Sequence, residues 1–179
     1  MLNHTPSFLE IYEEFKGKVF NTVIGYLQNV EDAEEVTQDI FVEIHHSINS
    51  FEGKSSLSTW IYRISINKSL DFIKAKKRKK RFAFISSLFN DSGELKHDAP
   101  HFYHPGVILE NKEKSAILFS AIDSLAENQK TAFLLSKVEG LGNKEIAEVM
   151  NMNVGGVESL LSRAKDNLRK KLGGEGRAE

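Results

Sequence analysis

The segment from Leu57 to Arg81 constrains the fold most, because its apolar residues recur at helical spacing and its last eight positions are almost all basic. Its first turn holds the chain's only tryptophan, Trp60, and we expect Ser58 or Thr59 to cap the helix. A helix that carries an aromatic ring at one end and a cationic run at the other suits DNA, because cations hold phosphates and rings stack on bases. A second interpretation stays open, in which Trp60 is a core residue and the basic run is a solvated helix end.

Charge is distributed unevenly along the chain, although the net charge is only −1. Residues 1–73 carry eleven acidic and five basic side chains, whereas residues 74–81 carry seven basic side chains and no acidic one. The stretch from Arg163 to Arg177 is again mostly basic. The basic segments are therefore candidate phosphate contacts, and the acidic first part must bind something other than DNA.

Composition excludes several classes of protein. Cysteine is absent from the 179 residues, which excludes a disulfide framework, a thiolate metal site and a cysteine nucleophile. No apolar run approaches the roughly 20 residues that a membrane span needs. The first residues also lack the order of charges and apolar residues that marks a signal peptide. We therefore expect a cytoplasmic protein that inserts into no membrane.

Helical periodicity on both sides of an aperiodic stretch predicts an all-α fold of two small domains joined by a flexible linker. Three or four helices are expected in the first domain and four in the second. The predicted helices cover about 7–28, 31–48, 57–81, 115–125, 128–138, 144–150 and 154–172. The predicted division is a first domain at 1–81, a linker at 82–114, a second domain at 115–172 and a flexible tail at 173–179.

Residues 143–160 have the pattern of a helix-turn-helix. Ala147 is the small residue that lets the two helices approach, and Asn151 occupies the turn, where a left-handed backbone is needed. Asn153 can cap the second helix. That helix would expose Gly155, Gly156, Glu158, Ser159, Ser162 and Arg163 away from the core. A helical hairpin used only for packing is the alternative interpretation.

With these motifs in order, the chain resembles extracytoplasmic-function sigma factors, the compact two-domain branch of the sigma-70 family, over about residues 8–172. DAEEVTQDIFVEI (32–44) looks like the family's polymerase-binding helix. The segment 51–79 looks like its promoter-melting and −10-reading part. The segment from Ile122 through LAENQK and the helix-turn-helix looks like its −35-reading domain.

The resemblance implies a non-enzymatic initiation factor that binds core RNA polymerase and promoter DNA and needs no cofactor. The acidic helix would dock on a coiled coil of the largest polymerase subunit through Asp32, Glu35, Gln38, Asp39 and Phe41. The loop from Phe51 to Ser56 would hold a base flipped out of the −10 element, where the DNA is single-stranded. The implied contacts to DNA at and near this element are Phe51, Lys54, Ser55, Trp60, Tyr62, Arg63, Asn67, Lys68, Lys74, Lys76, Lys77 and Arg78. The implied contacts to the double-stranded −35 element are Lys144, Gly155, Gly156, Glu158, Ser159, Ser162 and Arg163.

The chain departs from the family pattern at several positions. Ala126 stands where the family usually has proline, and Glu158 stands where many members carry a basic residue. Glu158 could accept a hydrogen bond from cytosine or simply be an exposed helical residue, and both interpretations stay open. Members of this branch are often silenced by an anti-sigma factor, which is therefore a candidate partner.

A stand-alone helix-turn-helix regulator, acting without core polymerase, is the main alternative function. No nucleophile and base stand at a spacing that indicates catalysis. His97, His101 and His104 have spacing that zinc could use, but they lie among prolines without cysteine, so we predict no metal site.

Overall fold

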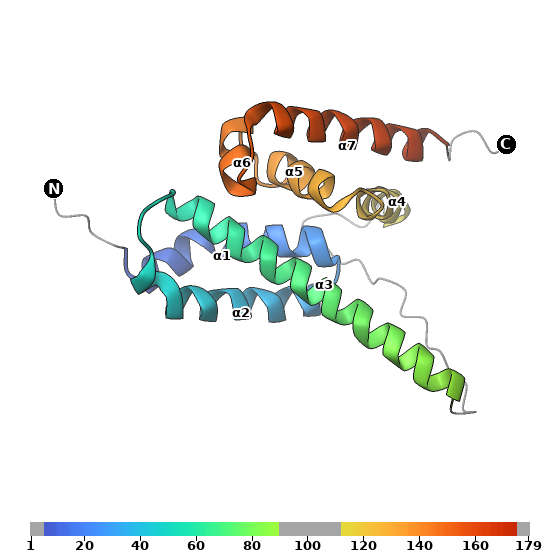
Figure 1. Cartoon of the computed structure of the whole chain (residues 1–179), viewed down its shortest axis with the longest axis horizontal. Coiled ribbons are helices and arrows are strands. Elements are labelled where there is room, and N and C mark those ends of the chain that lie inside the picture. Colours follow the sequence, from blue (N-terminus) through green and yellow to red (C-terminus); the bar gives the residue numbers. More distant parts are fainter. Residues whose placement is uncertain (1–5, 90–111, 175–179) are drawn as a thin grey trace.

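The computed structural model describes residues 6–89 and 112–174, and within these ranges every regular element is a helix (Figure 1). The predicted all-α fold is thus confirmed. In chain order the elements are α1 (Phe8–Leu27), α2 (Val30–Ser47), the 3₁₀ turn η1 (Ile48–Ser50), α3 (Leu57–Phe89), α4 (Lys112–Asp123), α5 (Glu127–Lys137), α6 (Asn143–Met150) and α7 (Val154–Gly174). Helices α1–α3 form an N-terminal domain, and α4–α7 form a C-terminal domain that lies against it (Figure 1).

Local sequence sets the ends of α1 and the start of α2. Ser7 and Glu10 form a capping box, in which the Glu10 amide donates to Ser7 Oγ at 3.3 Å and the Ser7 amide donates to Glu10 Oε2 at 2.7 Å. Gln28 ends α1 in the left-handed region at φ 54°. Asn29 then caps α2 by accepting a hydrogen bond from the Asp32 amide at 2.8 Å.

Helix α3 is capped two or three positions earlier than the sequence indicated. Ser56 Oγ accepts a hydrogen bond of 3.1 Å from the Thr59 amide, and the Ser56 carbonyl accepts one from Trp60. Ser58 and Thr59, the predicted caps, lie inside the first turn, so that prediction is wrong. The reason is that Leu57 already has helical geometry, which makes the residue before it the cap.

Helix α3 also extends further than the predicted end at Arg81, because it continues to Phe89. Residues 82–89 contain neither glycine nor proline, so nothing in them stops a helix that the preceding lysines and arginines favour. Helix α4 begins at Lys112, three positions before the predicted start of the second domain. The helical part of the chain therefore reaches into both ends of the stretch that the sequence indicated as a linker.

The helix-turn-helix follows the prediction closely. Asn151 has φ 51° and ψ 52° at the end of α6, which is the left-handed turn position expected for it. Asn153 Oδ1 accepts a hydrogen bond of 2.7 Å from the Gly156 amide and so caps α7. Ala147 is buried where α6 approaches α7.

Two hydrophobic clusters fill the described part of the molecule. One lies wholly within the N-terminal domain, and its most enclosed side chains include Ile11, Val19, Val23, Ile40, Ile44 and Ile61. The other contains the core of α4–α7 and also Tyr26, Tyr62 and Ile66 from the N-terminal domain. The second core is therefore shared by both domains, which the prediction of two domains on a flexible linker did not include.

Candidate nucleic-acid interface

The loop before α3 and the first turn of this helix bring two aromatic rings together. The ring centroids of Phe51 and Trp60 are 5.2 Å apart with the planes tilted by 43°. Both side chains are half-buried and pack on the N-terminal core. Lys54 is exposed beside them and forms an ion pair with Glu52, while Ser55 is half-buried. Trp60 is thus partly a core residue and partly accessible, and its predicted contact with DNA stays a prediction.

Tyr62 and Arg63, which follow on α3, contact the C-terminal domain. Tyr62 is only 4% exposed, and its hydroxyl donates a hydrogen bond of 2.9 Å to Glu139 Oε2. Burial and the nearby Glu139 carboxylate raise the pKa of Tyr62. Arg63 donates from Nε to the Val149 carbonyl at 3.2 Å and from Nη2 to the Glu148 carbonyl at 2.6 Å. In this arrangement neither side chain is free to contact DNA.

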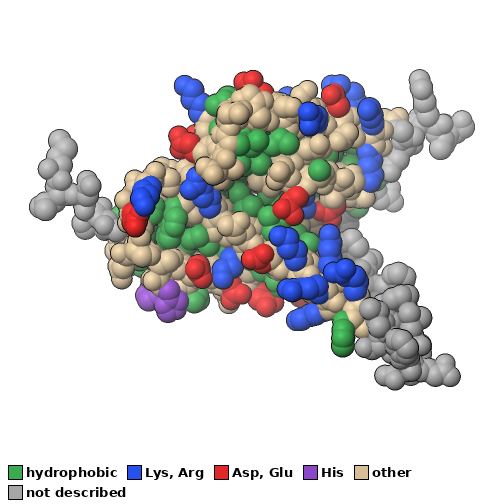
Figure 2. Space-filling model, in the orientation of Figure 1, with side chains coloured by type: hydrophobic (Ala, Val, Ile, Leu, Met, Phe, Trp, Pro, Cys, Tyr) green, Lys and Arg blue, Asp and Glu red, His purple; other side chains and the backbone are tan. Residues whose placement is uncertain are grey.

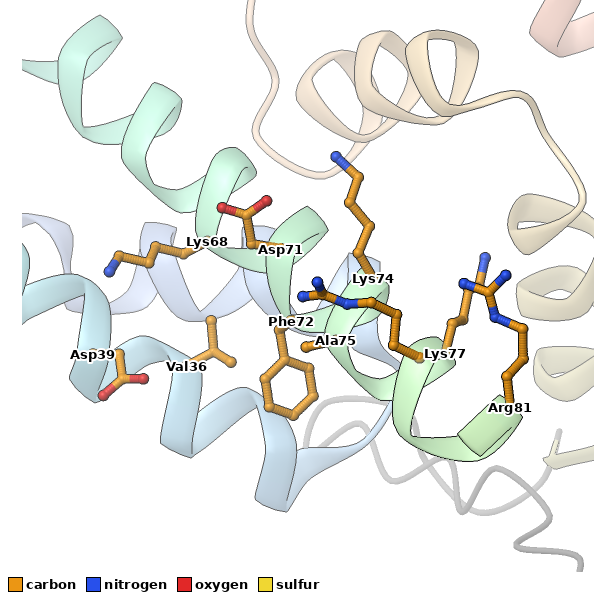
Figure 3. A pocket seen from close by; sticks show the side chains of 10 residues that line it. Val36, Asp39, Lys68, Asp71, Phe72, Lys74, Ala75, Lys77 and Arg81 are labelled. Carbon is orange, nitrogen blue, oxygen red and sulfur yellow. The ribbon is translucent and has the colours of Figure 1, made fainter. Parts of the chain in front are cut away.

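A groove of about 860 Å³ runs between α2 and α3, further along α3 than Tyr62 and Arg63 (Figure 3). Three of the residues that line the groove are apolar, namely Val36, Phe72 and Ala75, and the others are charged. The charged lining residues are Asp39, Lys68, Asp71, Lys74, Lys77, Arg78 and Arg81. Basic side chains therefore outnumber acidic ones here, and they gather over the lower part of α3 in the surface view (Figure 2).

Two of the predicted DNA contacts in this part already have acidic partners. Lys68 Nζ lies 3.4 Å from a Glu43 carboxylate oxygen, and Lys76 forms an ion pair with Asp32. Both pairs join α3 to α2 at the surface, where an ion pair contributes little and can be exchanged for a phosphate. Asn67 is exposed and lies on the same helix.

The acidic helix α2 presents most of its predicted contacts to solvent. Glu35, Gln38 and Asp39 are exposed, and Asp32 is half-buried by its pair with Lys76. Phe41 differs, because it is only 5% exposed. Its ring packs edge-on against Tyr12 at 4.8 Å and Phe8 at 6.5 Å. Phe41 thus fixes α2 on α1 instead of lying at the surface, since large aromatic side chains gain most by burial.

The second helix of the helix-turn-helix exposes the predicted set. Gly155, Glu158, Ser159, Ser162 and Arg163 are exposed and Gly156 is half-buried. Lys144 is exposed on α6. A β-carbon on Gly156 would come within 2.7 Å of Met152 Cε, so glycine keeps the start of α7 close to the turn. A helix that presents small residues at its start can approach the floor of a DNA groove.

Four residues of the domain contact were not predicted. Lys130 is 7% exposed, donates to the Tyr26 carbonyl at 3.1 Å and pairs with Asp123. Tyr26 Oη lies 2.5 Å from Thr131 Oγ1. Glu139, in the loop after α5, receives the bond from Tyr62, and burial raises its pKa. No signal for them exists in the sequence, because Lys130 stands in the polar run ENQKT (127–131) and looks like an ordinary surface lysine.

The described residues give no indication of a metal site. No group of three or more histidine or acidic side chains within 6–89 and 112–174 is arranged to hold a metal ion. His97, His101 and His104 lie outside the described residues. Among the described helices, none combines the length and the hydropathy that crossing a membrane requires.

Comparison with protein families matches two successive parts of the chain. Residues 11–79 match the model described as sigma-70 region 2, which covers α1, α2 and most of α3. Residues 115–168 match the model described as sigma-70, region 4, which covers the helix-turn-helix. Together these matches span the two domains seen in the structure.

Curated relatives and solved structures agree with this assignment. The ECF RNA polymerase sigma-E factor of Haemophilus influenzae is 29% identical over 166 residues, which are 93% of this chain and 87% of the relative. The RNA polymerase sigma-H factor of Pseudomonas aeruginosa is 27% identical over 159 residues, which are 89% of this chain and 82% of the relative.

Two solved structures share the fold with a TM-score of 0.65. CnrH in complex with the cytosolic domain of CnrY is 18% identical (93% of this chain, 88% of that one), and RpoE in complex with the anti-sigma factor NepR from Bartonella quintana is 21% identical (92% and 96%).

Proposed function

Because the chain belongs to the sigma-70 family as an extracytoplasmic-function sigma factor, a non-enzymatic protein that directs initiation of transcription by RNA polymerase, we propose a role for each of its surfaces. The N-terminal domain binds core polymerase and opens DNA at the −10 element. The C-terminal domain reads the −35 element. The protein acts in the cytoplasm, where polymerase and the chromosome are.

The exposed acidic face of α2 is the proposed polymerase contact. Glu35, Gln38 and Asp39 share one solvent-facing side of a helix that two packed neighbours hold in place. Carboxylates repel phosphate and attract a basic protein surface, so this face suits polymerase and not DNA. Phe41 supports that face from beneath and does not itself touch the partner.

The Phe51–Trp60 pair and the basic side of α3 are the proposed −10 surface. An accessible aromatic ring can stack on a base that has left the duplex, and the flanking loop supplies polar groups such as Ser55. Lys74, Lys77 and Arg78 continue along the same helix and would hold the backbone. Tyr62 and Arg63 belong to this surface by position, although both are engaged elsewhere in the structure.

The exposed face of α7 is the proposed −35 surface. Its first turn is capped and lies at the surface, and its first three turns carry Gly155, Glu158, Ser159 and Arg163 where a groove would meet them. The basic residues later on α7, including Lys170, would contact phosphates. An anti-sigma factor is a further proposed partner, since the similar RpoE was solved with the anti-sigma factor NepR.

The observation that carries this proposal is the occurrence on one chain of an acidic helix, an aromatic and cationic helix and a capped recognition helix. Run-off transcription from a genomic promoter library, with core polymerase and with or without the protein, tests it. Specific transcripts that need both components support the proposal, and their aligned starts define the two promoter elements. Tight duplex binding by the protein alone, with no dependent transcript, would favour a stand-alone regulator.

A further inference from the structure

Helix α7 is held in one fixed orientation by the core of the C-terminal domain. It packs on α4, α5 and α6 and lies on the side of that domain away from α1–α3 (Figure 1). Val157 is fully buried and Leu161 is 8% exposed, so one side of the helix is anchored. Gly155, Glu158 and Ser159 are exposed. Glu158 therefore projects from a surface that the core keeps in place.

Glu158 is the only charged side chain in the first nine residues of α7, VGGVESLLS. The positions three and four residues away on either side hold valine, glycine, leucine and serine, so no ion pair at helical spacing can form. No ion pair found within residues 6–89 and 112–174 involves Glu158, and the residue is exposed. The carboxylate is therefore available to a ligand that approaches the exposed face of α7.

The proposed ligand of this face, duplex DNA, is strongly negative, with one charge per roughly 1.7 Å of helix axis. A carboxylate is repelled by the phosphates and can gain only from a hydrogen-bond donor on a base. In the major groove the donors are the N4 amino group of cytosine and the N6 amino group of adenine. The adenine amino group lies between two acceptors, its own N7 and O4 of the paired thymine, whereas the cytosine amino group has an acceptor on one side only. Cytosine is therefore the base whose edge repels a carboxylate least.

We propose that Glu158 reads a cytosine in the −35 element by accepting a hydrogen bond from the N4 amino group, and that it thereby sets the promoter specificity of this chain. The proposal rests on the −35 surface proposed above and deepens it, because it names the base and the atom. Guanine and thymine present acceptors to the groove where cytosine and adenine present a donor, so the same carboxylate repels them. Attraction to one base and repulsion of others both contribute to selectivity.

Arg163 lies at the other edge of the exposed face. Five positions separate it from Glu158, which correspond to roughly 7.5 Å along the helix axis and roughly 140° around it. Gly155, Ser159 and Ser162 fall between them, so no side chain larger than serine separates the two charges. The helix can therefore approach the base edges closely, while Glu158 and Arg163 reach different base pairs.

Holoenzyme binding to promoter fragments that carry each of the four base pairs at every −35 position tests the proposal. Glu158→Gln is the decisive variant, because glutamine keeps the side-chain length, removes the charge and pairs with adenine through N6 and N7. We expect the unmodified protein to lose affinity on the order of tenfold when one cytosine is replaced, and Glu158→Gln to prefer adenine at that position. Glu158→Ala should bind all four base pairs there about equally.

A cytosine analogue without the N4 amino group, pyrimidin-2-one, tests the hydrogen bond itself. Placed opposite guanine at that position, it should weaken binding of the unmodified protein on the order of tenfold and leave binding of Glu158→Ala unchanged. Asp166→Asn is the matched control, because Asp166 is exposed on α7 and lies 3.4 Å from its partner Arg169. Removal of that charge should change the affinity for all sequences alike.

The outcomes distinguish a failure of this proposal from a failure of the function on which it rests. An unchanged base preference in Glu158→Gln, or a uniform gain for every sequence in Glu158→Ala, would make Glu158 an ordinary exposed residue and overturn the proposal, while the −35 surface stands. Equal affinity of the unmodified holoenzyme for every −35 sequence would overturn the proposed −35 surface, and the role of Glu158 with it.

Discussion

Arg63 Nη2 donates a hydrogen bond of 2.6 Å to the carbonyl oxygen of Glu148, a residue 85 positions later in the chain. The bond ties the N-terminal domain to the last turn of α6, where the Glu148 carbonyl also accepts a hydrogen bond of 3.2 Å from the amide of Asn151, the residue that ends the helix. An arginine at a helix C-terminus also interacts favourably with the helix dipole. A residue expected to contact promoter DNA thus serves in this structure as a cap for the helix-turn-helix.

Glu139 should make the domain contact dependent on pH. Burial raises its pKa, against the opposing effects of the Tyr62 and Thr22 hydrogen bonds and the Lys18 charge, so Glu139 binds a proton more tightly while the two domains are in contact than when they are apart. The stabilising contribution is then full below the ordinary carboxyl value of 4.5 and is lost as pH rises through the raised value. The chain has no cysteine, so one dye on Glu14→Cys in α1 and one on Asp166→Cys in α7, both exposed positions, would report this contact. Lowering the pH from 7 toward 4.5 should increase energy transfer between the two dyes.

Glu139→Gln is the control for this prediction. The amide oxygen still accepts the Tyr62 hydrogen bond but has no proton to gain, so energy transfer should change less with pH. An equally steep pH dependence in Glu139→Gln would assign the effect to other groups.

Trp60→Ala should impair strand opening more than formation of the closed promoter complex. Removal of the ring takes away a stacking surface worth about 1–3 kcal/mol per base, which corresponds to roughly 5- to 150-fold in the opening equilibrium. Permanganate reactivity of unpaired thymines would measure opening, and filter binding would measure the closed complex. Trp60→Phe, which keeps a ring against Phe51, should retain most of the opening. Equal losses at both steps in Trp60→Ala would argue against stacking.

Arg163→Ala should weaken binding to the −35 element and relax preference at one base pair. An exposed arginine on the recognition helix that contacts a base contributes about 1–3 kcal/mol of discrimination. Polymerase holoenzyme binding to a series of mutated −35 sequences would reveal it. Lys170→Ala is the contrast, because loss of a phosphate contact should weaken all sequences alike and reduce the salt slope by about 1. An Arg163→Ala profile parallel to that of Lys170→Ala would exclude base reading.

Asn151→Ala should destabilise the C-terminal domain by about 1 kcal/mol, because alanine is strained in the left-handed conformation at φ 51°. Asn151→Gly should cost less, since glycine adopts this conformation freely. Thermal unfolding followed by circular dichroism would compare the two variants. Equal melting temperatures for both would show that the backbone conformation at this turn does not limit stability.

Features governed by neighbours in the sequence were predictable. Helical periodicity gave the all-α fold, and the turn at Asn151 and the cap at Asn153 followed from what those side chains do locally. The exposed face of α7 followed from the same periodicity. The cap of α3 was misplaced by two or three positions, because three serines and a threonine within residues 55–59 can all serve as caps.

The sequence by itself determined the helices, the separation of acidic from basic segments and the recognition helix, since each depends on the order of residues within a few turns. Only the tertiary structure decided that the Phe41 side chain is buried between α2 and α1. It also decided that Tyr62 bonds to the Glu139 side chain and Arg63 to the Glu148 carbonyl. Contacts between residues 77 and 85 positions apart depend on how two folded domains match in shape and in hydrogen-bonding groups. No local pattern encodes that match, which is why the contact between the two domains emerged from the structure alone.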